Sequence, residues 1–164
     1  SEKKEEMSFM GAYCYYLQSP RYNLDQENTY IAIDKLQLFI SNYENSDRVA
    51  RASELILNLN EKLEKKDFEI ATSYYDTGNF QSAIYAIDEF MNRFPETKRI
   101  HELSFIQIQA YYELAKNSVE EKKEQRIKEA IFASDNFLLA FPSGNYKQEV
   151  KSMYQELKEI QNGL

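Results

Sequence analysis

The sequence has few of the residues from which catalytic and metal sites are made. Its 164 residues include one cysteine, one histidine and no tryptophan. One cysteine cannot form an internal disulfide, and one cysteine with one histidine cannot supply the several ligands of a zinc site. The 4 glycines are too scattered to form a loop that cradles phosphate. The sequence therefore predicts no metal, no cofactor and no enzymatic activity.

Proline and positive charge are also scarce. With 3 prolines and 4 glycines, the chain has too few turn residues to favour an all-β domain. A net charge of −7 disfavours binding to nucleic acid or to an anionic membrane surface. No apolar run approaches the roughly 20 residues that span a bilayer. The chain begins with Ser1 rather than Met, so we expect an engineered, processed or internal boundary there.

The apolar residues are spaced for helices. Phe80, Ile84, Ile87 and Phe94 share one face of a predicted helix, and Pro95 ends it. No strand-like alternation persists for more than a few residues. The chain is therefore predicted to be helical nearly everywhere.

One long helix is predicted over residues 47–77, because this stretch contains neither glycine nor proline. Its apolar stripe slips near Lys66 and Asp67, so two shorter helices are the alternative. Gly78 fits the position that closes a helix, where glycine is favoured. Two residues are predicted to be N-caps of the helices that follow them: Ser46 and Thr97.

Three segments of the sequence superimpose on one another. Each begins with alanine, has an aromatic residue seven positions later and carries a second aromatic four positions beyond that. The segments are Ala32–Tyr43, Ala83–Phe94 and Ala130–Phe141. An aromatic-rich helix precedes each of them, which is the tetratricopeptide pattern. In this pattern, small residues let paired helices approach closely and aromatic residues fill the space to the next repeat.

The predicted fold class is all-α, a tetratricopeptide-repeat α-solenoid with about three helical pairs and a C-terminal capping helix. We predict one domain over residues 1–164, with repeat-like units at about 7–45, 47–97 and 98–143 and the capping helix at 146–161. A terminal helix must cover the core with one face, so Met153 and Leu157 are expected to be covered. The residues expected on its solvated face are Lys151, Glu156, Lys158 and Glu159.

Tyrosine and charged side chains supply the candidate protein-binding residues. Tyrosine is enriched at interfaces because it combines a large ring with a polar tip. Core packing is favoured for Tyr74 and Tyr111, whereas core and surface are both open for Tyr75 and Tyr112. The candidates are Tyr75, Tyr85, Asp88, Arg93 and Tyr112. The alternative is that these side chains form a solvated face without a partner.

Three further features are expected to be structural rather than functional. His101 is expected to be a polar residue in the first turn of a helix, and Cys14 a small residue of the core. Residues 120–128 mix carboxylates with lysine and arginine, which favours a solvated helical face. Glu124 and Lys128 within this run are spaced for an i,i+4 ion pair.

The order of the segments resembles the C-terminal part of the BamD family, the tetratricopeptide lipoproteins of the outer-membrane β-barrel assembly machinery. The similar segments are Phe9–Tyr16, Asp25–Thr29, Phe39–Tyr43, the long helix with Gly78–Phe80, and Arg93–Thr97. Together they extend over roughly residues 7 to 160. The sequence departs from the family in lacking a lipidated cysteine at its start and two N-terminal repeats. Glu44 also stands where the first repeat usually has proline.

The resemblance implies a non-catalytic scaffold fragment at the periplasmic face of the outer membrane, with a lipid anchor upstream of this chain. It further implies two kinds of partner, namely the POTRA region of the barrel assembly protein and other assembly lipoproteins. The alternative is a generic tetratricopeptide adaptor or co-chaperone in another compartment. An enzyme is the weakest hypothesis, because no catalytic set of residues is present in the sequence.

Overall fold

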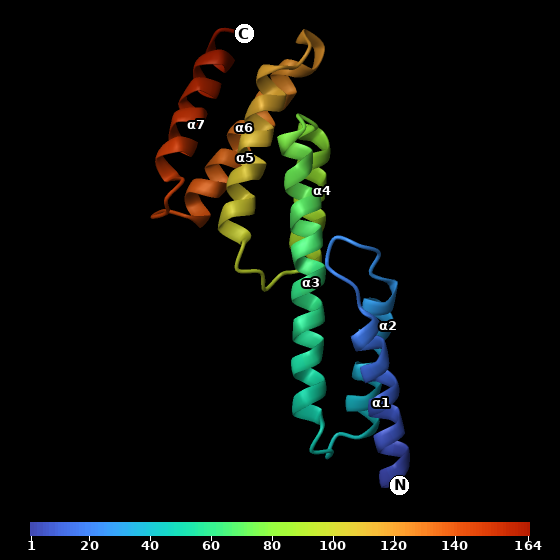
Figure 1. Cartoon of the computed structure of the whole chain (residues 1–164). Helices are drawn as coiled ribbons and strands as arrows, with labels where there is room; N and C mark the ends of the chain where they lie inside the picture. Colours follow the sequence, from blue (N-terminus) through green and yellow to red (C-terminus); the bar gives the residue numbers. More distant parts are fainter. The chain divides into compact units, whose positions relative to one another are not determined.

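Seven α-helices account for most of the chain, and there is no strand (Figure 1). The computed structural model describes all residues, 1–164. The helices are α1 (Glu2–Gln18), α2 (Glu27–Asn42), α3 (Val49–Asp76), α4 (Phe80–Arg93), α5 (Ile100–Lys116), α6 (Glu120–Ala140) and α7 (Lys147–Asn162). The all-helical prediction is confirmed, and so is the prediction of one long helix between residues 47 and 77.

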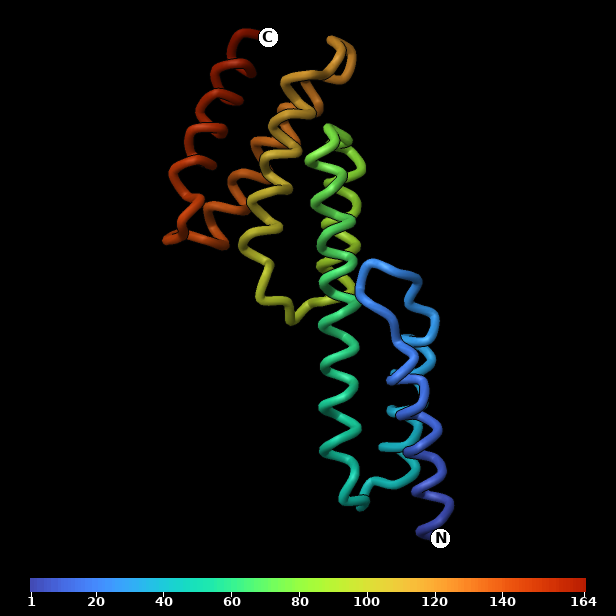
Figure 2. Tube along the Cα trace, viewed as in Figure 1, coloured from blue at the N-terminus to red at the C-terminus, as the bar shows by residue number.

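The chain divides into two compact units, Ser1–Asp67 and Phe68–Leu164, which we describe separately. The division falls inside α3, whose course is continuous in the trace (Figure 2). It also lies next to Lys66 and Asp67, where the apolar stripe of the sequence slips. The predicted limits of the repeats, and the predicted single domain, stay predictions.

The N-terminal unit pairs α1 with α2. Ala12 and Ala32 are both buried, so the two helices can approach closely. Phe39 is fully buried. Its ring packs edge to face against the ring of Phe9, with the ring centroids 5.3 Å apart. The prediction that Cys14 is a core residue is wrong, because its side chain is exposed. The small residue that α1 buries is Ala12, two positions earlier and about 200° around the helix.

The loop between α1 and α2 is organised by a buried glutamine. The side-chain amide of Gln26 donates hydrogen bonds to the carbonyl oxygens of Arg21 (2.8 Å), Tyr22 (3.3 Å) and Leu24 (3.0 Å). Its side-chain oxygen accepts one from the Thr29 hydroxyl at 2.6 Å. One buried side chain therefore joins three loop carbonyls, of which those of Arg21 and Leu24 also accept from the Leu24 amide and the Lys66 ammonium.

The repeat positions found in the sequence have equivalent environments in the structure. The three alanines at the start of the repeated segments are buried, and so are the aromatic residues seven positions later: Phe39, Phe90 and Phe137. Each of these rings packs against the second aromatic of its segment. The centroid distances are 5.4 Å for Phe39–Tyr43, 5.0 Å for Phe90–Phe94 and 5.0 Å for Phe137–Phe141.

The end of α3 agrees with the sequence prediction. Gly78 has a φ of +78°, which is favourable for glycine and strained for other residues. The amide of Gly78 donates to the Tyr75 carbonyl at 3.0 Å, and the amide of Asn79 donates to the Tyr74 carbonyl at 2.8 Å. These two bonds form a Schellman motif, which satisfies the last carbonyl groups of the helix.

The two predicted N-caps are displaced from the helix starts. The Ser46 hydroxyl accepts a hydrogen bond from the Arg48 amide, and the Thr97 hydroxyl accepts one from the Arg99 amide, both at 3.1 Å. Arg99, not Thr97, occupies the N-cap position of α5. Ser46 and Thr97 therefore close the turn that precedes each helix, and the prediction that they are N-caps is wrong by two residues.

In the C-terminal unit, α5 and α6 pack against each other and α7 packs against both (Figure 1). Val150 and Leu157 of α7 are fully buried, and Met153 is half-buried, as a capping helix requires. Of the four residues expected on the solvated face, Lys151, Glu156 and Glu159 are exposed. Lys158 differs, because it is half-buried with its ammonium 5.8 Å from the centre of the Tyr154 ring.

His101 lies in a cluster of aromatic rings and is not merely a polar residue of the first turn. Its ring centre is 4.5 Å from that of Phe141, 5.0 Å from Tyr146 and 5.8 Å from Phe137. Its Nε2 atom is buried without a hydrogen-bond partner. Gly144, in the loop before α7, lies close to the Cε1 and Nε2 atoms of the imidazole. The expectation for His101 therefore missed its packing role, since the contacting rings come from α6 and the loop after it.

Adding one methyl group at Gly144 is expected to destabilise the protein. A Cβ atom there would lie 2.6 Å from both Cε1 and Nε2 of His101, and the surrounding rings leave the imidazole little room to move. We expect Gly144→Ala to lower the free energy of unfolding by about 1–3 kcal/mol, as overpacking usually does. Urea denaturation followed by circular dichroism measures this change.

Gly11→Ala is the matched control, because a Cβ on Gly11 meets nothing within 4 Å. Gly11 lies inside α1, so its replacement should stabilise the helix by roughly 0.5–1 kcal/mol. Equal stability of the Gly144 variant and the wild type would contradict the steric argument.

Candidate docking groove

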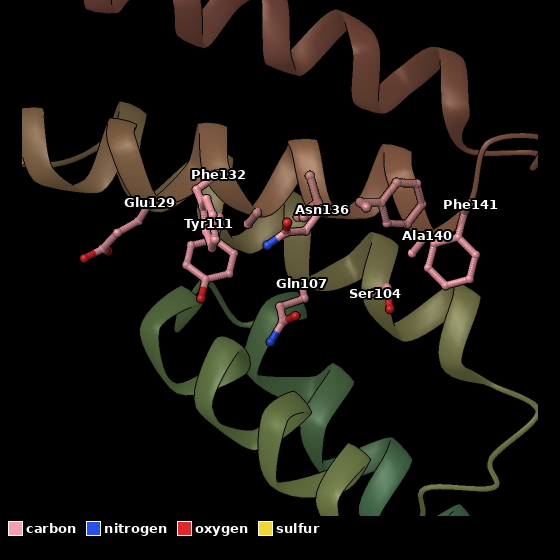
Figure 3. Close-up of a pocket in the computed structure, with 11 residues that line it drawn as sticks. Ser104, Gln107, Tyr111, Glu129, Phe132, Asn136, Ala140 and Phe141 are labelled. Atoms are coloured by element: carbon pink, nitrogen blue, oxygen red, sulfur yellow. The ribbon is translucent and has the colours of Figure 1, made fainter.

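A groove of about 360 Å³ lies between α5 and α6 in the C-terminal unit (Figure 3). Its lining residues on each helix recur every three or four positions, so each helix contributes a single face. The lining residues are Ser104, Gln107, Ile108 and Tyr111 on α5, and Glu129, Phe132, Ala133, Asn136, Phe137, Ala140 and Phe141 on or directly after α6.

The groove has an apolar floor and distinct ends. Ile108 and Phe137 are buried at its base, whereas the ring of Phe132 is 68% exposed at its rim. Figure 3 shows Glu129 and Tyr111 near one end and Phe141 at the other. A bound chain would therefore meet a carboxylate beside the rings of Tyr111 and Phe132 at one end, and the ring of Phe141 without a carboxylate at the other.

Polar side chains occupy the middle of the groove. The Gln107 amide donates hydrogen bonds to the Asp88 carboxylate at 2.7 Å and to the Ile84 carbonyl at 3.2 Å, both on α4. The side-chain oxygen of Gln107 is left as an acceptor. Neither the Asn136 amide nor the Ser104 hydroxyl forms a hydrogen bond within the protein. These three groups can serve a ligand without breaking a bond of the fold.

The electrostatic character of the groove is negative. No lysine or arginine occurs in residues 80–92, 100–115 or 129–146, which include the groove-lining parts of the helices. Burial raises the pKa of Tyr111, and the Asp88 and Glu129 carboxylates raise it further. Two carboxylates, Asp88 and Glu129, therefore act on the phenol of Tyr111.

Three of the sequence candidates are exposed on α4. Tyr85 is 67% exposed, and Asp88 and Arg93 are also exposed. Asp88 is linked to the groove through Gln107. The guanidinium of Arg93 lies 5.6 Å from the centre of the Phe94 ring at the end of α4. The binding role of all three stays a prediction.

The other two candidates have packing partners within the unit. Tyr75 is half-buried against a cluster of Ala83, Ile84 and Ala110, and burial raises its pKa. The Tyr112 hydroxyl donates to the Glu156 carboxylate and accepts from the Lys116 ammonium at 2.8 Å. Tyr112 therefore links α5 to α7, and its replacement would disturb the fold as well as any interface.

Core packing is the favoured prediction for Tyr74 on α3, and this prediction is wrong. Tyr74 is 38% exposed, whereas Tyr75 packs inward. Tyr75 follows the buried Ala71 by about one helical turn and shares its face, and Tyr74 is rotated from Tyr75 by about 100° around the helix. The prediction for Tyr111 is confirmed, because it is half-buried against two apolar clusters.

Sequence reasoning missed most of the groove, although one signal pointed to it. Tyr85 and Phe132 occupy the same position in their repeated segments, two residues after the alanine, and both rings are exposed. An aromatic residue at a solvated repeat position is the cue that could have identified Phe132. The solvated run over residues 120–128 was correctly predicted, including the Glu124–Lys128 ion pair at 2.6 Å.

A family model described as "YfiO: Outer membrane lipoprotein" matches residues 1–125 and 69–161. A comparison with curated proteins found no match. Within the fold, none of the helices combines the length and the apolar character that crossing a membrane requires. The two matched ranges overlap and together extend over residues 1–161, from the first residue into the last turn of α7.

Proposed function

Because the chain belongs to the YfiO outer membrane lipoprotein family, which is the BamD family, we propose that it is a non-catalytic scaffold of outer-membrane β-barrel assembly. The observation that carries the proposal is the family match over nearly the whole chain. The repeated helical pairs support it, because stacked helices offer extended surfaces for other proteins. In this role the protein binds and positions its partners and changes no covalent bond.

The proposed partners are the POTRA region of the barrel assembly protein and other assembly lipoproteins. The proposed location is the periplasmic face of the outer membrane, with a lipid anchor supplied upstream of this chain. Family membership supports an outer-membrane association. The second candidate is a generic tetratricopeptide adaptor or co-chaperone, which would act in another compartment and would not need the POTRA region.

Titration calorimetry of the chain against a purified POTRA region tests the proposal. We expect binding, and we expect Tyr85→Ala to weaken it about thirtyfold, since truncating an aromatic anchor typically costs about 2 kcal/mol. Tyr85 suits this test better than Tyr75, because its ring is exposed and does not support the fold.

Leu38→Ala is the control, because Leu38 is another large exposed residue, in α2 of the N-terminal unit. Unchanged affinity is expected for this variant. Absence of binding by the wild-type chain would contradict the scaffold proposal, and wild-type affinity of a folded Tyr85→Ala variant would exclude α4 as the contact.

A further inference from the structure

We propose that the groove between α5 and α6 binds an extended segment of a partner protein in which a lysine or arginine precedes an apolar side chain. This inference rests on the proposed function, because it specifies the chemistry of a segment that such a scaffold would hold. Three features carry the argument: the Glu129 carboxylate in the groove lining, the Asp88 carboxylate bonded to Gln107, and the three available polar groups.

The charge of the groove selects a cation. Asp88 and Glu129 both raise the pKa of Tyr111, so both carboxylates act on the same part of the groove. Lys128 and Arg126 precede Glu129 on α6 but have other partners, since Lys128 pairs with Glu124 at 2.6 Å and Arg126 donates to the Ser118 hydroxyl at 2.7 Å. A positive side chain entering there gains attraction from two carboxylates, whereas a negative one is repelled.

The opposite end of the groove favours an apolar side chain. Phe137 and Ile108 close the floor, and Phe141 stands at the end (Figure 3). The exposed ring of Phe132 lies at the Glu129 end of the groove, where a bound segment would also cover it (Figure 3). Burying aromatic and aliphatic surface of this kind yields roughly 25 cal/mol per Å² removed from water.

The polar middle of the groove favours an extended backbone over a helix. Asn136 has a side-chain amide that can donate to a carbonyl and accept from an N–H group, and Gln107 and Ser104 add acceptors. A helix has already paired its own backbone groups, whereas an extended segment has them free. The available groups of the groove therefore match what an extended segment must satisfy.

Three capped synthetic heptapeptides test this inference: GSKLFSG, GSELFSG and GSKSSSG. Each is titrated into the isotopically labelled full chain, and the side-chain amide signals of Asn136 and Gln107 are followed by NMR. We expect the first peptide to shift both signals and to bind at least tenfold more tightly than the other two. Equal affinities of the first and second peptides would overturn the charge argument, and unshifted amides would overturn the site.

A matched pair of variants separates the groove from general electrostatics. Glu129→Lys reverses a charge inside the groove, and Glu121→Lys makes the same change on the solvated face of α6. We expect the first variant to lose about tenfold in affinity for GSKLFSG and the second less than twofold. An equal loss in both variants would overturn the proposed site.

Analytical ultracentrifugation tests whether the groove is instead occupied by a second copy of this chain. Self-association that Glu129→Lys abolishes would overturn the proposal in favour of that copy, whereas a monomeric chain supports it. The peptide titrations contain no POTRA region. If the peptides fail to bind while the POTRA region binds, this inference is overturned and the scaffold proposal stands. If the peptides bind while the POTRA region does not, the scaffold proposal is overturned and the peptide-binding groove stands.

Discussion

Replacement of Phe90 by alanine is expected to lower the free energy of unfolding by about 3–5 kcal/mol. Phe90 is 2% exposed and lies in a cluster with Ala71, Ile87 and Leu103. Its ring also packs against Phe94 and Phe68, with centroid distances of 5.0 and 6.4 Å. The contacts come from α3, α4 and α5, so truncation leaves a cavity that none of these helices can fill by itself.

Thermal and urea denaturation measure the effect of Phe90→Ala. Phe132→Ala is the matched control, because it removes the same side chain from a site that is 68% exposed. We expect the control to change stability by no more than about 0.5 kcal/mol. A similar shift for both variants would show that Phe90 is not the packing centre that the structure indicates.

The second large effect is expected for Leu157→Ala in the capping helix. Leu157 is 0% exposed and belongs to a cluster with Ala115, Ile127 and Ile131, so α7 covers apolar residues of both α5 and α6. We expect the free energy of unfolding to fall by about 2–5 kcal/mol. Loosening of α7 should also expose Ile127 and Ile131, because no later helix covers them.

Urea denaturation measures the loss of stability, and binding of a hydrophobic dye under native conditions measures the exposure of the cluster. Leu139→Ala is the control, since Leu139 is 80% exposed on α6. Undiminished stability of the Leu157 variant would contradict the role of α7 as a cap.

The helical repeat could be predicted because it depends on periodic spacing. The alanines and aromatics that recur at fixed positions are also the buried ones, since every repeat meets its neighbours in a similar way. Gly78 was predictable for a local reason, because a left-handed residue at a helix end strongly favours glycine. These features need no knowledge of which helix packs against which.

The errors concern choices that depend on neighbouring helices. Whether Tyr74 or Tyr75 faces inward is decided by the position of Ala83 and Ile84 on α4. Cys14 has the size of a core residue but lies away from the face of α1 that α2 covers. The surroundings of His101 come from residues more than thirty positions later in the chain, so periodicity along α5 could not reveal them.

The groove was hidden from the sequence for a related reason. Its polar residues are unremarkable one at a time, and only the pairing of α5 with α6 brings Gln107 and Asn136 to the same cavity. The link from Gln107 to Asp88 then adds a third helix. A sequence pattern on one helix cannot encode a site that three helices share.

The lack of lysine and arginine around the groove determines which mapping methods can detect an occupant. Amine-directed cross-linkers have no lysine to attach to within residues 129–146 or 100–115, so they could report a partner only through the flanking Lys116, Lys128 and Lys147. Trypsin cuts after Arg99 and Lys116 and would release α5 as one peptide. It would release residues 129–147 as another. Carboxylate footprinting would therefore report occupancy of the groove through these two tryptic peptides.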